Sequence, residues 1–144
     1  MTEDQFEIIR IEKPEEAAWG IIGRGLHSFN VQHAGEENFR RLCFALLSPD
    51  REIVGGVLGE IFWDWLHVDL MWIQDGLRGR GFGHRLLLAI EDEARQQGAQ
   101  NAFLDTFSFQ NPEFYQQHGY RVFGQLSGFP AGHQRIFLTK RLAP

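Results

Sequence analysis

The sequence predicts an α+β fold, in which a mixed and mostly antiparallel sheet is flanked by helices. Seven short apolar segments have the length and composition of strands, and three segments with helical features lie between them. In two places strands follow one another without an intervening helix, so strands and helices do not alternate as they do in an α/β fold. The 144 residues show no repeat, low-complexity stretch or linker. We therefore expect one domain over residues 1–144.

The first elements are a strand and a helix. Residues 6–11 are mostly apolar and indicate a short strand. Pro14 and the two glutamates after it indicate a helix start, because proline suits the first helical turn and acids suit its positive end. We expect this helix to extend to about Leu26 and a polar loop to occupy residues 29–38.

Three strands are expected next. They cover residues 39–47, 52–62 and 66–73, with a Ser-Pro-Asp turn after the first and a tight hairpin turn at residues 63–65 after the second. The third is almost continuously apolar, as expected of a central strand.

In the last part of the sequence, helices and strands alternate more regularly. A loop rich in glycine and arginine covers residues 74–83, and a helix begins at His84 and ends at Gly98, which suits a left-handed cap. After a strand at residues 102–107, Asn111 and Pro112 indicate the cap and first position of a short helix that ends at Gly119. Two closing strands are expected at residues 120–126 and 134–139.

Composition excludes several classes of function. The net charge of −5 argues against nucleic-acid binding and weakly favours a cationic partner. No apolar run approaches the length of a membrane helix, and the acidic start lacks a signal-peptide pattern, so we expect a cytoplasmic protein without membrane contact. The single cysteine, Cys43, cannot form an internal disulfide, and its apolar surroundings indicate a buried thiol.

The glycine- and arginine-rich loop is the most informative segment. It joins a strand to a helix, and glycines there would let the backbone approach a phosphate group at the helix N-terminus. The spacing Gly79-x-Gly81-x-Gly83 does not match the dinucleotide-binding fingerprint, and the lysine of the ATP-binding P-loop is absent. A plain connecting turn is the alternative.

Two linked motifs resemble those of one family. Arg78-x-x-Gly81-x-Gly83 is similar to the pyrophosphate loop of the GCN5-related N-acetyltransferases (GNAT), and the run from Asn111 to Tyr120 resembles that family's N-x-x-F-Y-x-x-x-G-[FY] motif. The likeness covers nearly the whole chain and points to a small, single-domain, bacterial-type member. It implies a sheet of six to seven strands whose central pair splays apart to hold coenzyme A.

The resemblance implies a set of coenzyme A contacts. Main-chain groups of Met71 and Ile73 would bind the pantetheine arm, and the loop would bind the pyrophosphate. The implied contact residues are Met71, Ile73, Arg78, Gly79, Arg80, Gly81, Phe82, Gly83, His84, Asn111 and Tyr115. For single members of this set the alternatives are solvated arginines, a plain helix cap at Asn111 and a core aromatic at Tyr115.

The resemblance also implies the chemistry. A neutral amine would attack the thioester carbonyl, the Ile73 N–H would polarise that carbonyl, and Tyr115 would protonate the departing thiolate. Glu60 is the predicted general base. Asp69, Asp105 and His133 are the other candidates.

The expected function is therefore acetyl-CoA-dependent transfer to a primary amine of a small molecule. Alternatives are a peptide N-terminus or lysine as acceptor, or a non-catalytic coenzyme A sensor. No metal is expected, because no metal-binding spacing of histidines occurs, and homodimerisation is an expectation from the family alone. The acceptor pocket is expected over residues 26–37 and 126–135, with His27, Asn30, His33, Trp63 and His133 as candidate lining residues.

Overall fold

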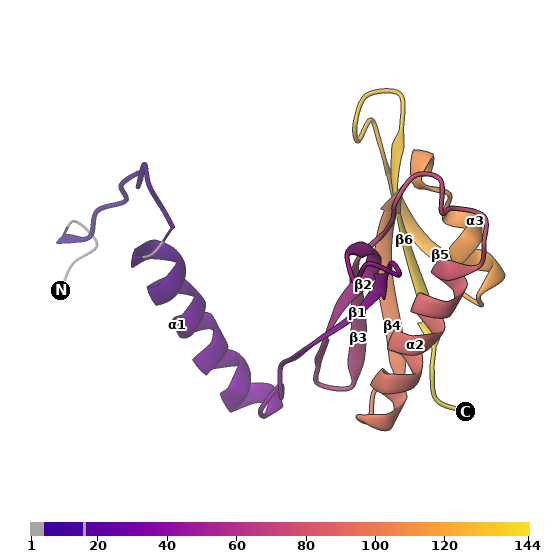
Figure 1. Cartoon of the computed structure of the whole chain (residues 1–144). Helices are drawn as coiled ribbons and strands as arrows, with labels where there is room; N and C mark the ends of the chain where they lie inside the picture. Colours follow the sequence, from indigo (N-terminus) through magenta and orange to yellow (C-terminus); the bar gives the residue numbers. More distant parts are fainter. Residues whose placement is uncertain (1–4, 16) are drawn as a thin grey trace. The chain divides into compact units, whose positions relative to one another are not determined.

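The computed structural model describes residues 5–15 and 17–144, which fall into two compact units that divide between Glu37 and Asn38 (Figure 1). In the first unit the helix α1 covers Ala17–Ala34. The predicted strand at residues 6–11 is wrong, since these residues have no regular structure and the described part of this unit contains no strand with which they could pair.

The loop predicted at residues 29–38 is wrong for its first part, because α1 continues to Ala34. The His33 ring stacks on Phe29 with centroids 4.2 Å apart, and its Nδ1 donates to the Phe29 carbonyl at 2.9 Å. Gly35 then ends the helix with a φ of 81°. Local contacts within the last turns thus extend a helix whose polar composition suggested a loop.

The second unit is one six-stranded sheet with helices. The order across the sheet is β1-β2-β3-β4-β6-β5, and every pairing is antiparallel except that of β3 with β4. The predicted mixed sheet is confirmed. Its elements are β1 Arg40–Leu47, β2 Ile53–Phe62, β3 Trp65–Ile73, α2 Phe82–Gln96, β4 Asn101–Phe107, a 3₁₀ turn Ser108–Gln110, α3 Pro112–Gln117, β5 Arg121–Ser127 and β6 Gln134–Arg141.

The central strands β3 and β4 are paired only at their beginnings. Trp65, Leu66 and His67 of β3 lie beside residues 101–103 of β4, and beyond this point the two strands have no pairing with each other. A β-bulge on β3 places an extra residue, Asp69, between the partners of Leu58 and Gly59. Because a bulge bends its strand, it accounts for the parting of β3 from β4.

The apolar core lies between the sheet and α2. Leu87, Ile90 and Ala94 of α2 are fully buried, as are Ile61 and Leu66 of the sheet. The helix thus buries residues three and four apart, the spacing of one apolar helix face. Gly59 fits beneath it, because a Cβ there would lie 2.9 Å from the Ile90 side chain and 2.7 Å from the His67 carbonyl.

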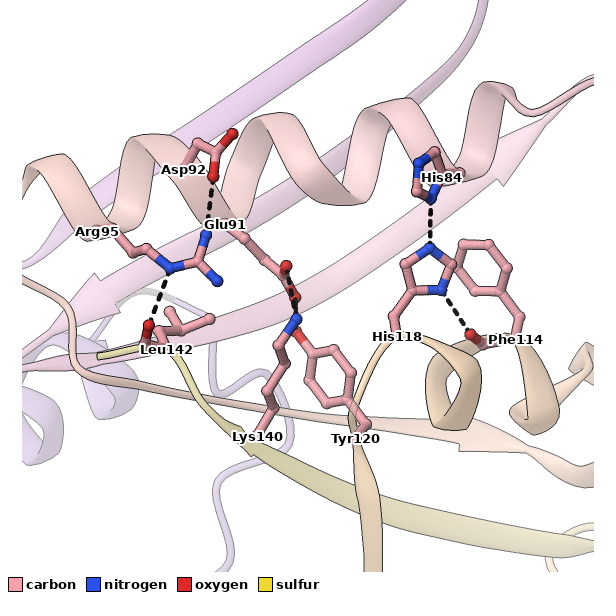
Figure 2. A network of polar contacts seen from close by, with 9 residues as sticks. All are labelled: His84, Glu91, Asp92, Arg95, Phe114, His118, Tyr120, Lys140 and Leu142. Carbon is pink, nitrogen blue, oxygen red and sulfur yellow. Dashed lines mark hydrogen bonds and ion pairs between the residues drawn. The ribbon is translucent and has the colours of Figure 1, made fainter. Parts of the chain in front are cut away.

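One charged group is buried in this core. Glu91 of α2 has no exposed surface; the Lys140 ammonium lies 2.9 Å from its Oε1, and the Tyr120 hydroxyl donates to its Oε2 at 2.7 Å (Figure 2). The three side chains come from α2, β6 and the residue before β5. Burial first, and then the Glu91 carboxylate, raise the pKa of Tyr120 above its ordinary value of 10.

Cys43 is exposed, so the prediction of a buried thiol is wrong. Side chains alternate along a strand: Leu42 of β1 faces the core, and Cys43 points to the opposite face. Among the described residues, no helix is both long and apolar enough to cross a membrane.

Candidate active site

The parting of β3 and β4 opens a cleft of about 710 Å³. Its walls are the second half of β3, the second half of β4, the turn after β4 and the start of α3. Residues from these four segments and from the loop after β3 line it: Val68, Asp69, Leu70, Met71, Trp72, Ile73, Arg78, Leu104, Asp105, Thr106, Phe109, Gln110, Asn111 and Tyr115.

Along the cleft, the outer edge of β3 pairs with no other strand of the described residues. The Gln74 N–H donates to the Val54 carbonyl, so Gln74 faces β2. Backbone groups alternate in direction along a strand, so those of Ile73 and Met71 face away from β2, toward the cleft. The Ile73 carbonyl accepts a hydrogen bond from Arg78 Nε at 3.1 Å. The remaining groups of this edge can pair with an extended ligand.

The loop after β3 brings bare backbone to the start of α2. Gly79 and Gly81 have φ values of 74° and 85°, and a Cβ at either position would meet nothing within 4 Å. Gly81 is the N-cap of α2 and provides no side-chain hydrogen bond to the helix. The first N–H groups of α2 are therefore without a side-chain cap, which suits an anion. These residues fit a pyrophosphate.

Arginines surround this loop. Arg78 is anchored to the Ile73 carbonyl, and its Nη1 lies 4.0 Å from the Asp75 carboxylate. The guanidinium groups of Arg80 and Arg85 lie over the Phe82 ring, 5.5 and 5.9 Å from its centroid. Positive charge is thus concentrated where the uncapped helix begins.

A histidine pair connects the start of α2 to α3. His118 Nδ1 lies 2.8 Å from the Phe114 carbonyl, and His118 Nε2 lies 2.7 Å from His84 Nδ1 (Figure 2). Because the carbonyl only accepts, neutral His118 carries its proton on Nδ1 and accepts at Nε2 from His84. The sequence motifs predicted His84 as the start of the helix and as a coenzyme A contact, but not its bond to His118.

Asn111 directly precedes α3 and has an unusual backbone conformation. Its φ of 62° is left-handed, and its side chain makes no capping hydrogen bond to the helix that it precedes. By position Asn111 is the N-cap of α3, as predicted, but its side chain does not cap that helix. A strained backbone at a residue that lines the cleft is typical of a functional position.

Tyr115 of α3 is one of the residues that line the cleft. Its ring packs edge-on against those of Phe114 and Tyr120, with centroids 5.1 and 6.0 Å away. Tyr115 lines the cleft, and its hydroxyl makes no hydrogen bond among the described residues. Burial raises the pKa of the Tyr115 phenol above its ordinary value of 10, because desolvation disfavours the phenolate. The group therefore keeps its proton at neutral pH.

Glu60 is not part of the cleft lining. Its Oε1 accepts a hydrogen bond from His67 Nδ1 at 3.0 Å, and the His67 ring stacks on Phe103 with centroids 4.6 Å apart. His67 and Phe103 form the last paired rung before β3 and β4 separate. No local sequence pattern indicates this pair, because it depends on the register of β2 against β3.

The other predicted bases divide into two groups. Asp69 and Asp105 line the cleft, whereas His133 lies in the turn between β5 and β6, edge-on to Phe109 with centroids 5.0 Å apart. Asp105 also accepts a hydrogen bond from Arg135 Nε at 2.7 Å.

The predicted acceptor residues of the N-terminal segment lie on α1. His27 Nδ1 is 3.6 Å from the Glu37 carboxylate, and His33 contacts Phe29. Asn30 lies between them in sequence, and Trp63 lies in the β2–β3 turn of the second unit. Their role in acceptor binding stays a prediction.

Comparison with known proteins agrees with this geometry. Blasticidin-S acetyltransferase of Streptomyces morookaense is 41% identical over 92 residues, which are 63% of this chain and 68% of that protein. An acetyltransferase of Agrobacterium fabrum is 30% identical over 116 residues, 81% of this chain and 85% of the relative. The crystal structure of an acetyltransferase from Bacillus cereus superposes with a TM-score of 0.85 at 32% identity, covering 92% of this chain and 97% of that one.

The model of the acetyltransferase (GNAT) family matches residues 6–120, which include the cleft, the loop and α3 up to Tyr120. The resemblance inferred from the two motifs is confirmed, and with it the N-acetyltransferase class of enzyme. This chain belongs to the GNAT family of acetyltransferases.

Proposed function

We propose that this chain transfers an acetyl group from acetyl-coenzyme A to the primary amine of a small molecule in the cleft between β3 and β4. The observation that carries the proposal is the continuity of the free β3 edge, the bare glycine loop and the uncapped start of α2. A small-molecule acceptor is supported by the similarity to an enzyme named for blasticidin S.

Each part of this surface matches one part of the ligand. The edge at Met71 and Ile73 would pair with the amide groups of pantetheine as an added strand does. The N–H groups after Gly81 and the surrounding arginines would bind the pyrophosphate. Asn111 and Tyr115 lie across the cleft from β3, beside the position of the thioester.

The reaction needs a base, an acid and a hydrogen-bond donor for the carbonyl oxygen. The amine must lose a proton, its nitrogen bonds to the thioester carbonyl carbon, and the carbon–sulfur bond then breaks. Tyr115 supplies the proton that the sulfur takes up, since its phenol is neutral and faces the cleft. A backbone N–H of the β3 edge stabilises the carbonyl oxygen as it gains charge.

The carboxylates that line the cleft, Asp69 and Asp105, are the groups placed to take the proton of the amine. Glu60 stays a prediction in this role. Its path to the cleft would pass through His67, whose Nε2 is left as an acceptor once Nδ1 donates to Glu60.

The proposal is tested by calorimetric titration with acetyl-coenzyme A, in the unaltered protein and in two glycine variants. Gly81→Ala and Gly98→Ala both place a Cβ on a residue with positive φ and open space around it, so both should lose about 1–2 kcal/mol of stability. Only Gly81→Ala obstructs the phosphate position, and we expect it to weaken binding at least tenfold while Gly98→Ala binds normally.

Saturable binding followed by thiol release with an amine would support the transferase. Equal effects of the two glycine variants would contradict the assignment of the loop. Binding without transfer to any amine would favour the coenzyme A sensor, and transfer only to peptides would favour the protein acetyltransferase.

A further inference from the structure

Arg135 of β6 is held in a fixed position beside the cleft. Its Nε donates to Asp105 Oδ1 at 2.7 Å, and Asp105 lines the cleft. Its guanidinium lies 5.8, 5.1 and 5.5 Å from the ring centroids of Phe107, Phe129 and Phe137. A guanidinium that lies over three aromatic rings and donates to a carboxylate is restricted in conformation before any ligand binds.

The two terminal nitrogens of the guanidinium are available to a ligand. In the portion of the chain that the structure describes, neither terminal nitrogen of Arg135 makes a hydrogen bond, and a third of the side chain (33%) is exposed. With Nε engaged by Asp105, the two terminal nitrogens form a free fork. A carboxylate accepts two parallel hydrogen bonds from such a fork.

The surroundings connect this fork to the cleft. Phe107 packs on Arg135 and stacks on Phe109 at 5.4 Å, and Phe109 lines the cleft with more than half of its surface (58%) exposed. Asp105 has one oxygen bound to Arg135, and its second oxygen has no hydrogen bond among the described residues. Arg135 can therefore bind a carboxylate, Asp105 can bind an amine, and Phe109 provides an apolar surface beside them.

We propose that the acceptor of this enzyme carries a carboxylate near its amine, as an amino acid does, and that Arg135 binds that carboxylate. Asp105 then accepts a hydrogen bond from the amine and directs it toward the thioester. The inference rests on the proposed function, because it names the acceptor class of the same cleft. Arg135 is a specificity-determining residue in this arrangement and has no part in coenzyme A binding.

The test compares amino acids with their C-terminal amides as acceptors in a thiol-release assay. Methionine, leucine, phenylalanine and tryptophan are each paired with the amide that has the same side chain and amine. Each rate is divided by the concentration of the neutral amine, because amidation makes the amine less basic and so raises its neutral fraction. The variants are Arg135→Gln, Arg135→Lys and the control Arg121→Gln, an exposed arginine of β5 in the same sheet.

We expect the unaltered enzyme to prefer the amino acids. Arg135→Gln should lower kcat/KM for them by about 10- to 100-fold, the loss expected for hydrogen bonds to a charged group, and change the amides less than about threefold. Arg135→Lys should keep part of the preference, and Arg121→Gln should change neither class. Coenzyme A affinity should be the same in all four proteins.

Three results would overturn the inference. They are a preference of the unaltered enzyme for the amides, equal losses for both acceptor classes in Arg135→Gln, and no transfer to either class by a protein that binds coenzyme A. The preference of the unaltered enzyme needs no variant, so the inference stays testable if Arg135→Gln does not fold. Failure to bind coenzyme A at all would instead overturn the proposed function.

Discussion

Tyr115 and Tyr120 differ in what their hydroxyl groups face, although their rings pack against each other, that of Tyr115 partly buried and that of Tyr120 buried. The Tyr115 hydroxyl borders the cleft and is unpaired among the described residues, whereas the Tyr120 hydroxyl donates to the buried Glu91. The same substitution at the two positions therefore removes a functional proton in one case and a structural hydrogen bond in the other.

We expect Tyr115→Phe to lower kcat by about 100-fold or more, the usual contribution of a general acid, with little change in acetyl-coenzyme A affinity. Tyr120→Phe is the matched control. It should keep kcat and lose about 1.5–3 kcal/mol of stability, because a hydrogen bond to a charged group is removed. Steady-state kinetics, calorimetry and denaturant unfolding measure the three quantities. Unchanged turnover in Tyr115→Phe would remove this residue from the mechanism.

Among the secondary-structure elements, α2 is joined to the C-terminal strands by the Glu91 network. Lys140 and Tyr120 neutralise and hydrogen-bond a carboxylate that has no exposed surface. The N-terminal end of the same helix carries the candidate phosphate site. The network therefore fixes the helix whose start must meet the ligand.

Removing one member of a buried ion pair leaves an uncompensated charge. We expect Lys140→Met to destabilise the protein by about 3–5 kcal/mol in denaturant unfolding. Arg141→Met, at the neighbouring exposed position of β6, should cost less than about 1 kcal/mol. The double variant Glu91→Leu with Lys140→Met should recover most of the loss. Equal effects of the Lys140 and Arg141 variants would show that the pair contributes nothing.

Elements formed by interactions between residues close in sequence could be predicted, whereas elements that depend on a partner elsewhere could not. The strands of the second unit were predicted to within about two residues because alternating or continuous apolar patterns and turn residues are local signals. The strand at residues 6–11 was wrong because an apolar run without a partner strand has no ladder to join. The end of α1 was missed because a stacked His33–Phe29 pair supports it.

The candidate site shows the same division. The loop glycines and the Asn111–Tyr115 motif were predictable, since each residue acts through its own backbone or a fixed local spacing. Glu60 with His67, Asp105 with Arg135 and Glu91 with Lys140 were not, because strand register and helix packing bring these partners together. In the first case the pairing also depends on the β3 bulge, which shifts the register by one residue.

At the scale of the whole molecule, the chain contains only two tyrosines, and burial raises the pKa of both above 10. Below pH 10 both are neutral in the folded and unfolded states, so they add no pH dependence. Above pH 10 the unfolded chain loses protons that the folded protein keeps, and stability therefore falls as the pH rises. Each tyrosine lowers the free energy of unfolding by up to about 1.4 kcal/mol per pH unit in this range.

Tyrosinate absorbance should therefore stay low in the folded protein above pH 10 and rise together with the loss of far-ultraviolet circular dichroism. Tyr115→Phe should reduce the slope of stability against pH, since one of the two shifted groups is gone, and Tyr120→Phe should do the same independently. Gly98→Ala, which alters neither tyrosine, should keep the slope of the unaltered protein at a lower overall stability. Ionisation of both tyrosines near pH 10 in a protein that remains folded would contradict their burial, and with it the neutral phenol on which the acid role of Tyr115 depends.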